Sequence, residues 1–276
     1  MKILVYTDNH YSATSSAIKL NGKKYTTRLE NQIKSINWVE QLAKDNGVKM
    51  IVCLGDFFDK PQLNDEELTA LKDINWADDI LHYFIVGNHE AVNSNLAFNT
   101  VKALEGKNRI VINSPYSMSL GTAEVNLLPY VIESNRKPLN EYFGTQTADK
   151  RIILSHNDIK GIRYGVFESK EGFDIKDIEA NCDLFVNGHL HNGTWITKKV
   201  RNLGNLTGQD FKEDAFIYNH CASIIDLDTL EMTDFENEFI IIEYKFLSFI
   251  STAESSDSIS ERLYTTVPEN TAGALG

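Results

Sequence analysis

The chain has 276 residues, of which 42% are hydrophobic and 24% charged. This composition excludes a disordered, fibrous or membrane-embedded protein, and the length allows a large core to form without disulfides. The three cysteines are scattered and lack the spacing of a zinc site, so we expect reduced, buried thiols. No secretion signal or membrane-length apolar run is visible, and we expect a cytoplasmic protein, in the host cytoplasm if its source is viral.

The net charge of -12 is concentrated at one end. The stretch from Asp210 to Gly276 holds 14 acidic and three basic residues, so the rest of the chain is nearly neutral. An acidic end should repel nucleic acid, and it either contacts a partner protein or forms a solvated surface.

The first hundred residues alternate between strand-like and helix-like segments. Apolar runs predict strands at 1–6, 50–54 and 84–86. Apolar residues at three- and four-residue steps, followed by Gly47, predict a helix at 27–45. Further helices are expected at 65–73 and at 95–104, the latter ending by Gly106. Asn64 is placed to cap the second of these helices. This order of elements is typical of an α/β fold.

From Arg109 onward the predicted elements are shorter. Strands are expected at 110–113, 116–120 and 124–131, a short helix at 139–143, and further strands at 152–154, 184–186, 194–199, 216–227 and 238–248. Turn signals at Ser114-Pro115 and Gly121 indicate an antiparallel portion or a second sheet packed on the first. We expect one domain, residues 1–250, followed by a mobile tail, residues 251–276.

Five of the predicted strands end in residues that bind metals. The polar residues that follow these strands include Asp8, His10, Asp56, Asn88, His156, His189 and His191. Ligands bind beyond the carboxyl ends of strands in α/β sheets, so these endings could converge on one site. Seven ligands are too many for one ion, and a mixture of oxygen and nitrogen donors fits a pair of transition metals. We expect two divalent ions, Mn in the first place, with Fe, Zn or Mg as alternatives.

Two carboxylates neutralise only half the charge of two divalent ions, so the filled site would attract an anion such as phosphate. Two metals can activate a hydroxide for in-line attack on phosphorus, which predicts hydrolysis of a phosphoester. His89 follows Asn88 directly and is excluded from the ligand set. We expect it to donate a proton to the leaving oxygen, with Asp59 orienting its ring. Lys160 and Arg163 are candidate phosphate contacts or, alternatively, solvated charges.

The motifs Asp8-x-His10, Gly55-Asp56-x-x-Asp59, Gly87-Asn88-His89-Glu90, His156 and Gly188-His189-x-His191 resemble the calcineurin-like metallophosphoesterase superfamily. The resemblance implies an α/β fold, a four-layer α/β/β/α sandwich of two mixed sheets flanked by helices. It also implies that Asp8, His10, Asp56 and His191 hold one metal. The second metal would be held by Asp56, Asn88, His156 and His189, with Asp56 bridging and His89 catalytic.

Within that superfamily the chain is most similar to the SbcD-type DNA nucleases of bacteria and phages. The similarity lies in the motif Gly55-Asp56-Phe57-Phe58-Asp59 and the pair Lys60-Pro61 after it. Ser/Thr phosphatases usually have Arg-Gly in place of Lys60-Pro61. A second likeness lies in Asn202-Leu203-Gly204-Asn205 and the residues up to Asp214. The resemblance implies a DNA exonuclease or endonuclease that acts with an SbcC-like ATPase in DNA repair, recombination or phage DNA metabolism, and a homodimer is left open.

Two other functions are open at this point. The first is a phosphatase or phosphodiesterase that acts on nucleotides or phosphoproteins. The second is a non-catalytic protein-binding scaffold, which the complete set of candidate ligands disfavours.

Overall fold

The computed structural model describes residues 1–14, 22–92, 95–164, 167–208 and 219–239. All of these belong to one unit that extends to Lys245. The predicted tail and most of the predicted strand at 238–248 lie outside the described residues, as do the first residues of the strand predicted at 216–227. The domain boundary at residue 250 therefore stays a prediction.

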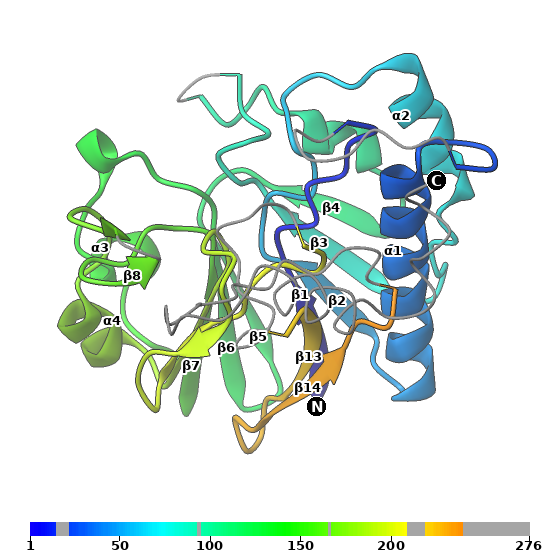
Figure 1. Cartoon of the computed structure of the whole chain (residues 1–276). Coiled ribbons are helices and arrows are strands. Elements are labelled where there is room, and N and C mark those ends of the chain that lie inside the picture. The colour runs from blue at the N-terminus through cyan, green and yellow to red at the C-terminus, as the bar shows by residue number, and fades with distance from the viewer. Residues whose placement is uncertain (15–21, 93–94, 165–166, 209–218, 240–276) are drawn as a thin grey trace, which may run out of the picture. The chain divides into compact units, whose positions relative to one another are not determined.

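Two six-stranded sheets form the centre of this unit (Figure 1). The first has the strand order β14-β13-β1-β2-β3-β4. Its strands are β1 (Lys2–Tyr6), β2 (Met50–Cys53), β3 (Leu81–Ile85), β4 (Arg109–Ile112), β13 (Cys221–Asp226) and β14 (Met232–Glu236). The first four run parallel, and β13 and β14 are antiparallel additions at one edge.

The second sheet has the order β11-β12-β10-β7-β6-β5. Its strands are β5 (Tyr116–Leu120), β6 (Ala123–Leu128), β7 (Lys150–Ser155), β10 (Leu184–Asn187), β11 (Thr194–Trp195) and β12 (Val200–Asn202). The four inner strands are parallel, and β5 and β11 pair antiparallel at the edges. A short hairpin of β8 (Arg163–Tyr164) and β9 (Phe167–Glu168) lies outside both sheets. Both main sheets are therefore mixed, as the resemblance implied.

Helices cover the two outer faces of this sheet pair (Figure 1). The α-helices are α1 (Thr27–Asp45), α2 (Asp65–Ala70), α3 (Asn140–Phe143) and α4 (Ile175–Asn181), and the 3-10 turns are η1 (Leu71–Asp73), η2 (Thr100–Leu104) and η3 (Glu133–Asn135). Alternation along β1 shows how the layers form, since Leu4 and Tyr6 face the core under α1 whereas Ile3 and Val5 face the core between the sheets. A third core, which includes Ile153, lies between the second sheet and α4. The four-layer α/β/β/α sandwich is confirmed.

Several elements differ from the predictions: helix α4 was not expected, and the strand expected at 194–199 is only β11, with β12 beginning at Val200. The helix expected over 95–104 is wrong in its first half, because the Asn95 side chain accepts from the Ala97 N–H and Asn99 caps η2 by accepting from the Lys102 N–H. The strand expected at 110–113 is β4, which joins the first sheet in parallel. Strand β14, which the sequence reasoning did not predict, pairs with β13 at the edge of that sheet.

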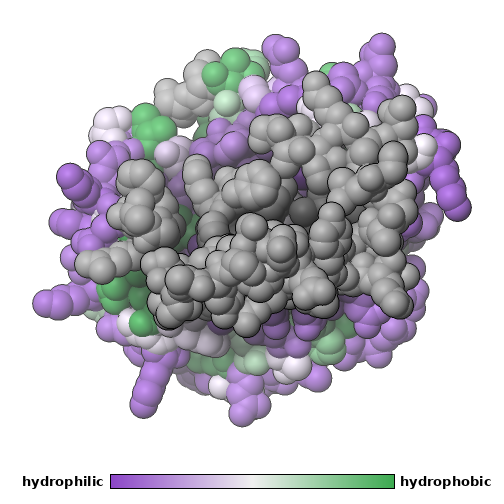
Figure 2. Space-filling model, viewed as in Figure 1, coloured by the Kyte–Doolittle hydropathy of each residue, from purple (hydrophilic) through white to green (hydrophobic). Residues whose placement is uncertain are grey.

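Other expectations are confirmed. Helix α1 spans the predicted residues, and Asn64 caps α2 by accepting from the Glu67 N–H at 2.9 Å. The three cysteines are buried and unpaired. Hydrophilic residues make up most of the described surface visible in Figure 2, with hydrophobic residues in scattered patches. Among the described helices, none is long and apolar enough to cross a membrane.

Candidate metal centre

The backbone at the strand ends is folded to present ligands. Four candidate ligands have a backbone φ between 47° and 77°, a left-handed conformation that residues other than glycine rarely adopt: Asp8, His10, Asp56 and His189. Each of the four follows the carboxyl end of β1, β2 or β10. Such strain persists where the surrounding structure fixes it, and it clusters at functional sites.

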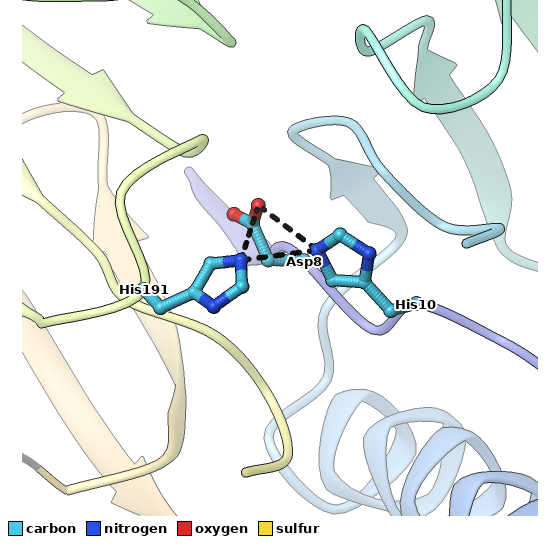
Figure 3. A group of neighbouring side chains, drawn as sticks. All are labelled: Asp8, His10 and His191. Carbon is cyan, nitrogen blue, oxygen red and sulfur yellow. Dashed lines mark hydrogen bonds and ion pairs between the residues drawn. The ribbon is translucent and has the colours of Figure 1, made fainter. Parts of the chain in front are cut away.

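One group of candidate ligands consists of Asp8, His10 and His191 (Figure 3). The Nε2 atoms of His10 and His191 are 3.1 Å apart. They lie 3.7 Å and 3.9 Å, respectively, from Asp8 Oδ1. Three donor atoms from the ends of two sheets therefore point at a common position, as expected for the first metal.

The second group consists of Asp56, His156 and His189. His156 Nε2 lies 3.1 Å from Asp56 Oδ2 and 3.2 Å from Asn88 Oδ1. The same Asn88 oxygen lies 3.0 Å from His189 Nδ1. The structure thus brings together all four residues expected to hold the second metal.

Asp56 lies between the two groups. Its Oδ2 is 3.1 Å from His156 Nε2 in the second group and 4.0 Å from His10 Nε2 in the first. Its Oδ1 is fixed separately, since it accepts a hydrogen bond of 3.0 Å from the His89 N–H. The position is the one that a bridging carboxylate requires.

The polar atoms of Asp8 fit a cation at the first position. Asp8 Oδ2 accepts from Thr7 Oγ1 at 2.6 Å and from the His189 N–H at 2.9 Å. Asp8 Oδ1 is fully buried and has no hydrogen-bond partner among the described residues. A buried carboxylate oxygen is costly without a partner, and a divalent ion would supply one.

The electrostatics of the cluster also favour cations. Burial opposes the charge of His10, but its contacts with the Asp59 and Asp8 carboxylates raise its pKa to about 10. Burial likewise opposes the charge of His156, and the charges of Asp56 and Asp8 raise its pKa to about 9. Burial alone would raise the pKa values of both aspartates, yet the charge of His156 holds them well below the ordinary carboxyl range. Without metals, protons on the imidazoles balance the carboxylates, and divalent ions can take that role.

The ring nitrogens that face away from the cluster have partners of their own. His156 Nδ1 lies 3.0 Å from the Leu54 carbonyl. His189 Nε2 lies 3.1 Å from Asp158 Oδ1. His10 Nδ1 lies 3.1 Å from Asp59 Oδ1. Such contacts fix the ring orientation of metal-binding histidines. The role of Asp158 was missed, although its place two residues after His156 offered a signal.

His89 lies outside these two groups, with 44% of its side chain exposed, and forms a third group of possible ligand atoms with His10 and Asp59. Its ring centroid is 4.7 Å from that of His10, edge to face. Asp59 contacts it chiefly through the main chain, since the Asp59 carbonyl oxygen is 3.0 Å from His89 Nδ1 and the carboxylate oxygen 3.9 Å. The structure thus places Asp59 against His89, and the Asp59 carboxylate lies closer to His10, at 3.1 Å from its Nδ1.

The two basic candidates do not join this cluster through any described contact. Lys160 is exposed in the loop after β7, and its N–H donates to the Phe173 carbonyl at 3.0 Å. Arg163 lies in β8, and its side chain is outside what the structure describes. Contact of either residue with phosphate stays a prediction.

Two neighbouring groups of carboxylate and histidine ligands, with Asp56 between them at the strand ends of a double-sheet sandwich, are the arrangement of a dinuclear metallohydrolase. Residues 1–225 match the calcineurin-like phosphoesterase family, and the chain belongs to that family. It is therefore a metal-dependent hydrolase of phosphoesters, and its family is dimetal-dependent.

Solved structures with a similar fold are distant in sequence. An archaeal phosphodiesterase is 12% identical, with 86% of this chain and 99% of that chain covered and a TM-score of 0.43. The protein TT1561 of Thermus thermophilus is 11% identical, with 86% and 99% covered and a TM-score of 0.48. A dimetal phosphatase from Danio rerio is 10% identical, with 88% and 96% covered and a TM-score of 0.47. A comparison with curated protein sequences gives no match.

Proposed function

We propose that this protein is a dinuclear, Mn-dependent phosphodiesterase that cleaves DNA as an SbcD-type exonuclease or endonuclease. The observation that carries the phosphodiesterase chemistry is the position of Asp56 between two complete ligand groups, with the exposed ring of His89 beside them. The choice of DNA rests on the similarity of the 55–61 segment and the 202–214 segment to SbcD-type nucleases.

The metal pair would be held by Asp8, His10 and His191 on one side and by Asn88, His156 and His189 on the other, with Asp56 between them. When bound, two such ions polarise a phosphoester and lower the pKa of water. Asp158 and the Leu54 carbonyl keep His189 and His156 oriented towards the donor positions. The protein therefore presents the ligand atoms before substrate arrives, which lowers the cost of reorganisation.

His89 is suited to the leaving-group oxygen. A carbonyl can only accept, so the contact with the Asp59 carbonyl places a proton on His89 Nδ1. Nε2 is then the atom that can gain and release a proton. In its protonated form His89 would donate from Nε2 to the departing oxygen.

Phe57 and Phe58 belong to the core and are fully buried, so they shape the loop that carries Asp56. Lys60 pairs with Glu67 at 2.9 Å. These residues therefore do not provide a basic surface for DNA, and duplex affinity depends on basic residues that neutralise phosphates. We therefore propose that an SbcC-like ATPase holds the DNA while this chain cuts it.

The test is cleavage of end-labelled linear DNA and closed circular DNA with Mn(II), alongside a small bis-phosphodiester. The full chain is compared with His89→Ala and Asp56→Asn, with and without a candidate ATPase partner. DNA cleavage that is lost in both variants is expected. Turnover of the small ester without DNA cleavage, even with the ATPase, would favour a phosphodiesterase on nucleotides or another small substrate. Absence of any hydrolysis or bound metal would favour the scaffold.

A further inference from the structure

A cavity of about 600 Å³ adjoins the candidate metal centre at Asn88. We call it the Tyr130 pocket. Its lining includes Asn88, Leu96, Ala97, Asn113, Tyr130 and Val131. These residues follow the carboxyl ends of β3, β4 and β6, so the pocket lies at the sheet edge that carries the metal ligands.

Three contacts fix the pocket relative to the metal centre. The Tyr130 ring lies 5.7 Å from the ring of His189. The Tyr130 N–H donates to the Val86 carbonyl at 3.0 Å and so joins the end of β6 to the end of β3. The next N–H, of Val131, donates to Asn157 Oδ1 at 2.8 Å. The wall that Tyr130 forms is therefore held by hydrogen bonds from two main-chain N–H groups and can be preformed before a ligand binds.

The lining chemistry selects the type of ligand. None of the lining residues described by the structure is charged, so the pocket offers no cationic side chain to a second phosphate or an acidic peptide. It combines an aromatic ring, aliphatic walls and several side-chain amides. An amide both donates and accepts, which matches the polar edge of a nucleobase, and aromatic rings stack on base faces. The volume is in the range of pockets that hold small organic ligands.

We propose that the Tyr130 pocket binds the nucleobase next to the phosphoester that the metal centre hydrolyses. This inference rests on the proposed function, because it takes the substrate to be a nucleotide ester. The Asn88 side chain is the link, since it belongs both to the second ligand group and to the pocket wall. With phosphate at the metals, the attached nucleoside would extend past Asn88, and its base would meet Tyr130 and Asn113.

The test compares ligands that differ only in the base. Equilibrium binding of deoxyadenosine 5′-monophosphate and deoxyribose 5-phosphate to the full chain with Mn(II) is measured by calorimetry, which needs no turnover. We expect the nucleotide to bind about tenfold more tightly, as stacking of one base allows. Ala97→Trp, which fills the pocket, and Asn113→Ala should each remove most of this difference. Equal affinities in the wild type would overturn the proposal.

Matched controls are Ala148→Trp and Asn140→Ala, which change the same residue types outside the pocket and should keep the base preference. A preference that survives in Ala97→Trp would also overturn the proposal. A base preference without any hydrolysis would refute the proposed function and support base binding by the pocket. DNA cleavage without a base preference would support the proposed function and refute base binding by the pocket. Tighter binding of a short 5′-phosphorylated oligonucleotide than of the mononucleotide would assign the base to a DNA end, and equal binding would assign it to free nucleotides.

Discussion

Asp158 Oδ1 lies 3.1 Å from His189 Nε2, while the other nitrogen of the same ring faces Asn88 Oδ1. Asp158 therefore determines which way a candidate ligand of the second metal points. Asp158→Ala should weaken binding of one of the two metal ions by about 10- to 100-fold. Calorimetric titration with Mn(II) measures this, with the exposed Asp149→Ala as control. Unchanged affinity for both ions would refute the role of Asp158.

His89 is exposed and lies outside both ligand groups, so its loss should affect proton transfer more than metal binding. His89→Ala should lower kcat for a poor leaving group by about 10²- to 10⁴-fold. The variant should keep the metal content of the wild type, measured by elemental analysis. A bis-phosphodiester with a good leaving group should show a smaller loss. An equal loss on both substrates would argue against proton donation to the leaving oxygen.

Gly87 leaves room for the Asp56 carboxylate, since a Cβ at position 87 would overlap Asp56 Oδ1 and its main-chain nitrogen. Gly87→Ala should therefore displace the bridging carboxylate and lower both metal affinity and hydrolysis. Gly106→Ala is the control, because the nearest atoms there belong to the flexible end of Arg109. Circular dichroism distinguishes displacement from unfolding. Normal metal binding in folded Gly87→Ala would contradict the predicted displacement.

Glu67 is a buried carboxylate that ties the loop after β1 to α2. It accepts from the Ala13 N–H at 2.8 Å, from Ser12 Oγ at 3.1 Å and from Lys60 Nζ at 2.9 Å. Burial alone would raise the pKa of Glu67, but the bond from Lys60 and the main-chain donors lower it below the ordinary value of 4.5. Its contribution to stability is therefore present above pH 4.5 and is lost as the pH falls through the lowered value.

Glu67→Gln should destabilise the fold by about 1–3 kcal/mol near neutral pH, since the NH2 group that replaces one carboxylate oxygen cannot accept a hydrogen bond. It should also flatten the loss of stability on acidification. Urea unfolding at neutral and acidic pH measures both effects, and the exposed Glu141→Gln serves as control. A variant that loses stability with acid as steeply as the wild type would show that Glu67 is not the titrating group.

The strand endings could be predicted because each joins an apolar run to ligand-type residues in a few positions of sequence. The second partner of each histidine could not, since it depends on how the turns fold. Asp59 shows this: its spacing from Asp56 suggested a carboxylate contact with His89, but the turn places the carboxylate on His10 and leaves the carbonyl to His89. The Tyr130 pocket also could not be predicted from the sequence, because its walls come from three separate strand ends.

Local competition explains the misassigned elements. A helix was expected over 95–104, yet the side chains of Asn95 and Asn99 bond to nearby main-chain N–H groups and replace its first turns. Strand β4 resembled the short strands that follow it, and its parallel pairing with β3 is visible only in the sheet. Sequence patterns thus predicted the positions of the candidate metal ligands better than the helices and strands between them.

The central claim is that Asp56 joins two metal positions into one centre. Its most direct test is the number of Mn(II) ions bound per chain, measured by calorimetric titration of the metal-free full chain and of Asp56→Asn. We predict two ions in the wild type and a loss of affinity for both positions in the variant, with the far-ultraviolet circular dichroism unchanged. One ion or none in the wild type, or two ions bound equally well by Asp56→Asn, would contradict the claim.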